Sequence, residues 1–306
     1  MNEDMNEHIR KVLVHGVNGV QGAAIARGLR EEGFEVRGSV RHPAKSAALR
    51  EMGIDIVAAD LESASALRSA SQGVDAVVLT LPLEWNHETV LRWARHAAGA
   101  ARESGVRLLV MNSGTRLPAE PTDVPAFELR RAAEALVREG GPPTITLRPP
   151  FYMDNLASPW VVAGLARDRT LAYPLASRLR TSWLAAADLG TYAAAALRRP
   201  DLAGRTLDIG GPQVFDGPEL ARELSRVVGH ELRYFALAPQ AFEEGLVPAF
   251  GPAVARGIAR SYHWLAAHAD TVLLTGKDTD LERGLSRPLT TVAAWARAQT
   301  WSAAAA

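Results

Sequence analysis

Three glycines with regular spacing are the first residues in this chain that point to chemistry. Gly16, Gly19 and Gly22 follow the apolar run Lys11–His15 and precede a stretch of small, helix-forming residues. A glycine at a strand end permits a tight turn, and a backbone without Cβ atoms lets a pyrophosphate approach the free amides of a helix N-terminus. At the first strand-to-helix turn of an alternating chain, this spacing predicts a dinucleotide-binding loop.

The cofactor's identity depends on the end of the second expected strand, Phe34–Val40. Proteins that bind NAD usually place a carboxylate there for the ribose hydroxyls, whereas this chain has Arg41. A guanidinium holds a 2′-phosphate with two hydrogen bonds, and Lys45 would add a second charge. The pattern therefore favours NADP(H) over NAD(H). The alternative is an ordinary solvated arginine.

Polar and apolar residues also follow the third and fourth expected strands. Asp60 and Leu61 would border the adenine, and Thr80, Leu81 and Pro82 would face the crevice outside the strand ends. Asp60 is equally compatible with a helix N-cap or a turn.

These residues need a parallel sheet to bring them together, and the chain alternates accordingly. The expected strands are Lys11–His15, Phe34–Val40, Ile54–Ala58, Asp75–Thr80, Arg107–Asn112 and Thr144–Leu147. The expected helices between them are Ala23–Glu32, Ala44–Met52, Ser65–Ser71, Trp85–Ser104 and Pro125–Glu139. Six such units predict an α/β fold with a doubly wound parallel sheet of the Rossmann type.

The alternation loosens after Arg148, where a proline-rich and aromatic segment leads out of the sheet. We predict an NADP-binding Rossmann domain over residues 1–150, with a return strand and helix near 181–211. Residues 151–180 and 212–306 would form a smaller, mainly helical substrate lobe.

Composition excludes several other classes of function. Lys plus Arg and Asp plus Glu both number 34, so no basic excess indicates a nucleic acid partner. The chain has no cysteine, which excludes disulfides and thiolate metal sites, and its eight histidines show no ligand spacing. We therefore expect no bound metal. No apolar run is long enough to span a membrane, so we expect a cytoplasmic protein with no membrane partner.

Several consecutive segments closely resemble the NmrA-like atypical short-chain dehydrogenases. They are "GVNGVQG", "VRGSVRHP", "AADLESASALRSASQGVDAVVLTLP", "AARESGVRLLVMNSG", "AAEALVREGGPPTITLRPPFYMDNL" and "LDIGGPQVFDGPELARELSRVVGHELRY". The resemblance runs from Lys11 to Tyr234 in the family's order, and the chain after Tyr234 carries no recognisable pattern beyond a helical close.

The resemblance implies NADP(H) in a Rossmann domain and a small C-terminal lobe. Arg41 would then hold the 2′-phosphate. The phosphate loop would include Asn18, Val20 and Gln21, and the residues near the nicotinamide would be Phe151, Tyr152 and Asn155. The family contains quinone and isoflavone-type reductases, but also regulators that bind the dinucleotide without turnover.

The usual catalytic pair of short-chain dehydrogenases, Tyr-x-x-x-Lys, is absent. No tyrosine is followed four residues later by lysine, and no lysine occurs between Lys45 and Lys277. Alignment with the family by Glu134 places Arg130 at the position of its lysine. An arginine there would hydrogen-bond the ribose but would not act as an acid or base. Alternatively, Arg130 is an exposed helix residue beside Arg131 and Glu134.

Three other side chains are candidate proton donors. Ser113 follows the fifth expected strand, Tyr152 lies in the segment that leaves the sheet, and His87 follows the fourth strand. Each has a simpler interpretation: a turn residue, a packed aromatic ring and a solvated helix start.

The missing pair bears on the substrate. Quinones and conjugated double bonds accept hydride and take a proton from solvent, whereas ketones need a positioned acid. We therefore predict a small, conjugated, quinone-like, carbonyl or imine substrate that contacts His87, Tyr152, Asn155 and Trp160. The lobe's aromatic residues suit a flat apolar ligand, although they fit an ordinary core equally well. A reductase is favoured over a non-catalytic NADP(H) sensor that binds a protein partner, and the oligomeric state stays open.

Overall fold

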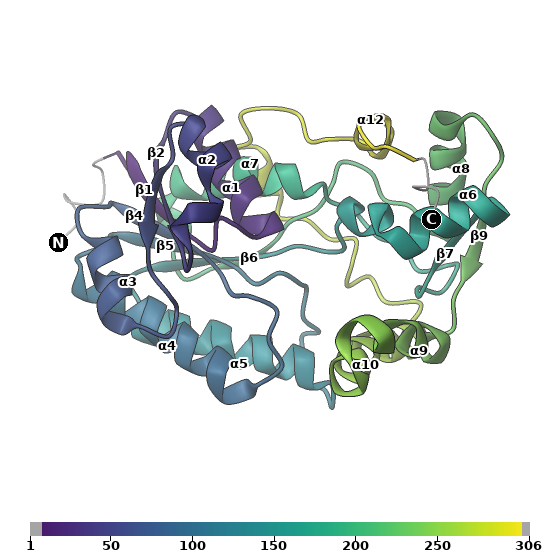
Figure 1. Ribbon diagram of the computed structural model, residues 1–306, viewed down its shortest axis with the longest axis horizontal. Coiled ribbons are helices and arrows are strands. Elements are labelled where there is room, and N and C mark those ends of the chain that lie inside the picture. The colour runs from purple at the N-terminus through teal and green to yellow at the C-terminus, as the bar shows by residue number, and fades with distance from the viewer. Residues whose placement is uncertain (1–7, 302–306) are drawn as a thin grey trace.

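The computed structural model describes residues 8–301 and contains a seven-stranded parallel sheet in the order β3-β2-β1-β4-β5-β6-β8 (Figure 1). Its strands are β1 Lys11–His15, β2 Glu35–Val40, β3 Asp55–Ala58, β4 Ala76–Thr80, β5 Leu108–Asn112, β6 Thr144–Arg148 and β8 Thr206–Asp208. The chain enters at the centre, winds outward to β3, and then reverses at β4. This order confirms the predicted doubly wound fold, and the reversal places a ligand crevice at the carboxyl ends of β1 and β4.

Helices cover both faces of this sheet (Figure 1). One face carries α1 Val20–Glu31 and α7 Leu189–Leu197, and the other carries α3 Ala64–Ser71, α4 His87–Glu103 and α5 Pro125–Gly140. Because side chains alternate along a strand, β1 contributes to two separate cores. Val12 and Val14 pack beneath α1 and α7, whereas Leu13 packs beneath α3, α4 and α5.

Some helices differ from the bounds expected from the sequence. α4 begins at His87 rather than Trp85 because the Asn86 side chain accepts a hydrogen bond from the Thr89 amide. The expected helix Ala44–Met52 is two short helices, a 3-10 turn Pro43–Lys45 and α2 Ala47–Glu51.

The smaller lobe lies beyond the carboxyl ends of the strands. The chain leaves the sheet through a 3-10 helix Met153–Ala157, and it returns through a 3-10 turn Ala186–Asp188, α7 and a 3-10 turn Pro200–Leu202. The other elements are α6 Pro159–Asp168, β7 Thr170–Tyr173, α8 Gly217–Val228, β9 Arg233–Ala236, α9 Pro239–Phe250, α10 Pro252–Ala267, α11 Thr279–Glu282 and α12 Val292–Arg297. A third core fills the lobe and draws residues from both 153–185 and 220–296. The lobe is thus mainly helical and discontinuous in sequence.

The lobe also contains a two-stranded parallel sheet, β7 with β9, that the sequence did not predict. Each strand has only four residues, and three of the four in β9 are exposed, including Phe235. Such short strands lack both the length and the apolar run by which the sheet strands are recognised.

The returning chain completes the large sheet. β8 pairs with β6, from Thr146 opposite Thr206 to Arg148 opposite Asp208. α7 packs so closely on α1 that a Cβ at Gly28 would lie 2.7 Å from the Gly190 Cα. Two glycines therefore let the helix that follows the glycine loop touch the helix of the return segment.

Candidate functional site

The glycine loop closes on its own backbone at the end of β1. Gly16 has φ 70° and its amide donates to the Ser39 carbonyl at 3.0 Å, while the Gly19 amide donates to the Gly16 carbonyl at 2.9 Å. A Cβ at Gly22 would lie 2.8 Å from the Gly16 carbonyl carbon and closer still to its oxygen. Gly16 thus requires a left-handed backbone, and Gly22 requires the absence of a side chain.

The N-terminus of α1 presents its amides to this loop. The first intrahelical bond runs from the Ala23 amide to the Gly19 carbonyl, at 2.8 Å, so the amides of Val20, Gln21 and Gly22 precede the helical ladder. Gly19 offers no capping side chain and the first turn holds no acid. With the helix dipole added, this end attracts an anion such as a pyrophosphate.

Two exposed cations follow β2 beside the loop. Arg41 comes directly after the strand and Lys45 ends the 3-10 turn, and neither is in an ion pair with another described residue. The Ser46 hydroxyl donates to the Asn18 side-chain oxygen at 2.8 Å, which ties this segment to the glycine loop. The chain therefore fits a dinucleotide with a 2′-phosphate, and the predicted roles of Asn18, Arg41 and Lys45 are compatible with this geometry.

The residues after β3 have local roles in the structure. The Asp60 carboxylate accepts a hydrogen bond from the Glu62 amide at 3.1 Å, so Asp60 forms a turn. The N-cap of α3 is Ser63, not Asp60. The Leu61 carbonyl contacts the His96 ring at 3.0 Å. The interpretation of Asp60 as a turn residue is therefore observed, and a contact of either residue with adenine stays a prediction.

Asn112, the last residue of β5, links the glycine loop to the crevice and was not singled out from the sequence. Its side-chain amide donates to the Gln21 side-chain oxygen at 2.8 Å and lies 3.4 Å from the Thr80 hydroxyl. Its own oxygen accepts the Gly114 amide at 3.1 Å. The feature of the sequence that indicates a role for Asn112 is a polar residue at the end of the fully buried strand "LLVMN". Asn112 thus holds three chain segments together at the strand ends.

Arg130 lies at the crevice, half-buried on α5. Its guanidinium contacts the Pro82 carbonyl at 3.5 Å, while Leu81 beside it is buried. Burial lowers the pKa of Arg130, and the neighbouring Tyr152 and Glu134 act in the opposite direction. An arginine at this position remains a cation, suited to holding a hydroxyl or a phosphate rather than to moving a proton.

Glu134, which anchors the alignment of Arg130 with the family, forms a buried ion pair on α5. Glu134 is only 1% exposed and accepts both hydrogen bonds of the Arg148 guanidinium, at 3.0 and 2.5 Å. A bidentate pair of this kind compensates the burial of both charges. It joins α5 to the end of β6, where the chain turns into the lobe.

Ser113 and His87 are not among the residues that line the aromatic cavity described below. The buried Ser113 hydroxyl donates to the Thr115 carbonyl at 2.6 Å and so braces the loop after β5. His87 is exposed in the first turn of α4. Both positions agree with the simpler interpretations given above, so their catalytic or substrate roles stay predictions without geometric support.

Tyr152 is buried where the chain leaves β6. Phe151 and Met153 bond to Leu184, at 3.0 and 2.8 Å, and fix the backbone on either side of it. Its hydroxyl has no hydrogen-bond partner of normal geometry among the described residues. Burial raises the pKa of Tyr152, opposed by the nearby Asn112 side chain and the Arg130 charge. The hydroxyl therefore keeps its proton at neutral pH and is available as a donor.

A cavity of about 250 Å³ lies against these residues. It is formed by the glycine loop, the loop after β5, the segment after β6, helix α10 and residues 273–274. Its lining is Gln21, Gly114, Thr115, Arg116, Phe127, Pro150, Phe151, Tyr152, Asn155, Ser261, Tyr262, Leu265, Leu273 and Leu274. The structure thus brings four predicted residues together here, Gln21, Phe151, Tyr152 and Asn155.

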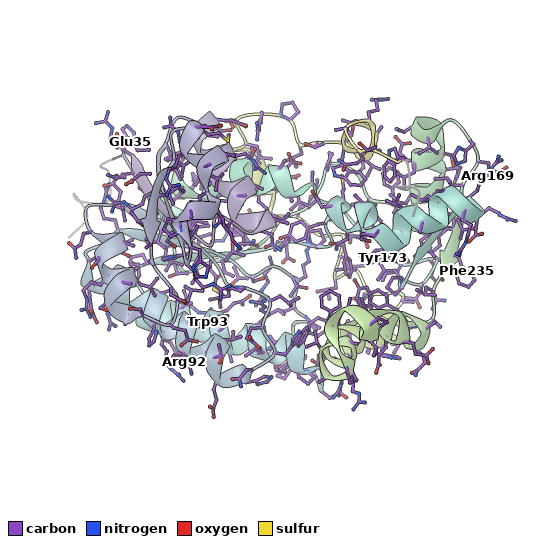
Figure 2. All side chains as sticks on the ribbon, viewed as in Figure 1. Glu35, Arg92, Trp93, Arg169, Tyr173 and Phe235 are labelled. Carbon is purple, nitrogen blue, oxygen red and sulfur yellow. The ribbon has the colours of Figure 1, made fainter. Side chains whose placement is uncertain are left out.

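Aromatic rings form the lobe side of this cavity. Phe151 stacks on Tyr262 with centroids 5.5 Å apart, and the Tyr262 hydroxyl lies 3.3 Å from that of Tyr173. Figure 2 shows Tyr173 inside the lobe. The Asn155 side-chain amide lies 3.5 Å from the Tyr173 hydroxyl. Trp160 stacks on Tyr173 but does not line the cavity. Tyr262 was missed because nothing in its local sequence marks α10 as part of a site.

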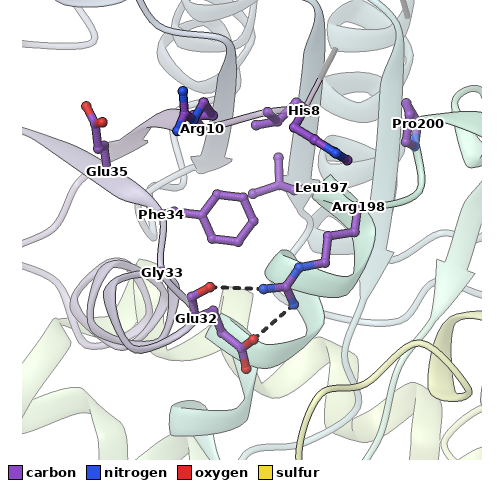
Figure 3. Close-up of a pocket in the computed structure, with 10 residues that line it drawn as sticks. His8, Arg10, Glu32, Gly33, Phe34, Glu35, Leu197, Arg198 and Pro200 are labelled. Carbon is purple, nitrogen blue, oxygen red and sulfur yellow. Dashed lines mark hydrogen bonds and ion pairs between the residues drawn. The ribbon is translucent and has the colours of Figure 1, made fainter. Parts of the chain in front are cut away.

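A larger cavity, of about 600 Å³, opens at the amino ends of the strands, opposite the glycine loop (Figure 3). Glu35, which begins β2, lies on its rim, and Arg198 bonds to Glu32 at 2.9 Å within it. The Arg198 guanidinium also lies 5.2 Å from the centre of the Phe34 ring. In parallel sheets ligands bind at the carboxyl ends of the strands, so this cavity at the amino ends is not the candidate site.

Two features of residues 8–301 bear on other classes of function. No group of three or more potential metal ligands is present in this part of the chain. No helix in it is long and apolar enough to cross a membrane.

A model of the NmrA-like family matches residues 8–293. The chain belongs to the NmrA-like family. The match continues well past Tyr234, where the resemblance in sequence had ended, and it includes α10, which lines the cavity.

Individual relatives of this NmrA-like protein cover nearly all of the chain. It is 28% identical over 288 residues to an NAD(P)H azoreductase from Xenophilus azovorans, covering 94% of this chain and 97% of that protein. It is 32% identical to a (4-alkanoyl-5-oxo-2,5-dihydrofuran-3-yl)methyl phosphate reductase from Streptomyces griseus, covering 82% and 85%. The crystal structure of a Citrobacter triphenylmethane reductase complexed with NADP(H) has the same fold, with a TM-score of 0.78, 19% identity and coverage of 94% and 99%.

Proposed function

We propose that this NmrA-like protein is an NADPH-dependent reductase of a small conjugated or quinone-like molecule. The observation that carries the proposal is the position of Gln21, which belongs to the glycine loop and also lines the aromatic cavity. A dinucleotide on the loop would therefore extend toward the cavity. The names of the relatives support this, since all three reported above are reductases and one of them is named an NAD(P)H azoreductase.

The residues present fit the cofactor's parts. The amides of Val20, Gln21 and Gly22 would bind the pyrophosphate, Arg41 and Lys45 the 2′-phosphate, and Arg130 the ribose on the nicotinamide side. Bound NADPH supplies a hydride. The protein's own task is to hold the acceptor flat against the reacting face and to exclude water, which the Phe151–Tyr262 side of the cavity favours.

The proton balance assigns a role to Tyr152. When hydride adds to one atom of a conjugated double bond, the π electron pair moves to the far atom, and that atom takes up a proton. Among the hydroxyl groups that line this cavity, the Tyr152 hydroxyl is the buried one without a hydrogen-bond partner in the described residues, so it would donate this proton and solvent would return it. Quinones need this donor least, because their reduced form is a stable anion that water protonates.

The test is NADPH oxidation, followed by absorbance, with a panel of quinones, enones, imines and azo compounds. We expect turnover with members of this panel and weak activity with saturated ketones. The control is the same protein with Gly22→Ala, which removes the loop's fit to the pyrophosphate. Tight NADPH binding without turnover across the whole panel would overturn the reductase and favour the dinucleotide sensor. A cytoplasmic location remains part of the proposal and is tested by fractionation.

A further inference from the structure

The loop after β5 carries a buried cation that neither the mechanism nor the sequence analysis used. Arg116 is 1% exposed, and its guanidinium donates to the Leu273 and Ile209 carbonyls, each at 2.7 Å, and to the Gly276 carbonyl. These three acceptors come from segments far apart in the sequence. They fix the plane of the guanidinium but neutralise none of its charge.

The Arg116 charge is not paired with a carboxylate in the described part of the chain. Burial lowers its pKa, and Asp208 opposes this only through space, without a direct bond. A guanidinium has five N–H donors, and the three carbonyl bonds leave two of them, one being Nε–H, which is buried and has no partner. An unsatisfied donor on a buried cation is costly, so the site gains stability from an added acceptor.

Arg116 also lines the cavity of the proposed substrate. Among the described residues of that lining it alone carries a formal charge, and the others are aromatic, aliphatic, glycine, proline or neutral polar. Thr115 and Ser261 add hydroxyl groups and Asn155 an amide. A lining with one cation and no acid discriminates against positively charged ligands and favours anions.

We propose that Arg116 binds an anionic substituent of the substrate, so that this reductase prefers conjugated molecules bearing a carboxylate, sulfonate or phosphate. The inference rests on the proposed function for the reacting part of the molecule, and adds the charge of the part that does not react. Arg116 acts as a specificity-determining residue, because the anion completes its set of acceptors while the conjugated part lies against Phe151 and Tyr262.

The test uses two ligands of matched shape. We would measure the Kd of 4-dimethylaminoazobenzene-4′-sulfonate and of the corresponding neutral 4′-sulfonamide by calorimetry, on wild-type protein saturated with NADP⁺. A charge-assisted bond predicts a preference of about tenfold or more for the sulfonate. Equal affinities in the wild type would overturn the proposal without any variant. Because binding is measured with oxidised cofactor, the result does not depend on turnover.

Two variants separate the charge from the clamp that Arg116 forms on the carbonyls. Arg116→Met should reduce the sulfonate-to-sulfonamide ratio to about one, whereas Arg116→Lys, which keeps the charge, should retain part of the preference. A purely structural role predicts that both ligands weaken together, with an unchanged ratio, and that outcome contradicts the proposal. If Arg116→Met does not fold, the wild-type comparison and the Arg116→Lys variant still test the proposal. Turnover of the two azo compounds with NADPH, measured separately, tests the proposed reductase.

Discussion

The two ends of the candidate site are built in different ways. At the glycine loop the functional groups are backbone amides and two exposed cations, all within the short segment from Gly16 to Lys45. At the cavity they are side chains from the glycine loop, the loops after β5 and β6, and α10. The first end depends on local backbone geometry and the second on packing between distant segments. We infer that local sequence determines which cofactor binds, whereas the packing of the lobe determines which substrate binds.

The largest effect is expected at the loop, where backbone contact leaves no space. Gly22→Ala places a Cβ against the Gly16 carbonyl, and NADPH affinity should fall about a thousandfold, or about 4 kcal/mol. Calorimetric titration measures this. The matched control is Gly99→Ala on α4, where a Cβ meets no atom within 4 Å. Retention of NADPH binding in Gly22→Ala would show that the loop is not the pyrophosphate site.

Stability at the loop end should depend on pH through His15. Burial lowers the pKa of His15 to about 4, and its Nε2 has no hydrogen-bond partner among the described residues. Between pH 6.5 and 4 the unfolded chain therefore binds more protons, so stability falls as the pH falls, by about 3 kcal/mol at most from this residue. His15→Gln should remove that part of the loss in urea unfolding, whereas the exposed His230→Gln should not. Equal pH slopes in all three proteins would contradict this prediction.

Removal of one exposed cation should weaken the binding of NADPH but not that of NADH. Arg41→Ala is expected to weaken NADPH by about thirtyfold, within the range of a charge-assisted hydrogen bond to phosphate, and to leave NADH unchanged. Arg102→Ala, an exposed arginine near the end of α4, serves as the control for net charge. A parallel loss of both cofactors in Arg41→Ala would mean that Arg41 does not contact the 2′-phosphate.

The smallest effect is expected at the cavity. Tyr152→Phe should lower kcat about tenfold for enones and hardly at all for quinones, because solvent protonates the reduced quinone. Thermal stability should stay unchanged or rise, since the hydroxyl that is removed has no partner. Steady-state kinetics on both substrate classes give the comparison. Equal losses for the two classes would assign Tyr152 to packing rather than to proton transfer.

The same contrast explains what could be predicted from the sequence. The sheet and the glycine loop follow from local patterns, because a buried parallel strand is a short apolar run and a loop without Cβ atoms needs glycine. Tyr152 and Asn155 line the cavity, whereas Trp160 packs on Tyr173 and does not line it; that Tyr152 or Asn155 lies near the nicotinamide stays a prediction. Their roles in binding and catalysis stay predictions.

The missed residues depend on contacts that no local pattern encodes. Arg116 is held by carbonyls of residues 209, 273 and 276, and Tyr262 reaches the cavity from α10. Glu134 is buried on α5 because it pairs with Arg148, which ends β6. In each case a distant segment decides whether a polar side chain is exposed or buried.

The pairing of β6 with β8 has a consequence for how the chain folds. Between Arg148 and Thr206 the chain travels through the lobe, so the edge strand of the large sheet docks only after this excursion has closed. Two of the three cores draw on distant parts of the chain, since the core beneath α1 and α7 includes residues after β8 and the lobe core waits for α8 to α12. Closing long loops slows folding and couples the parts. We expect one cooperative unfolding transition, and a ribosome-bound chain that ends before β8 would expose these two unfinished cores.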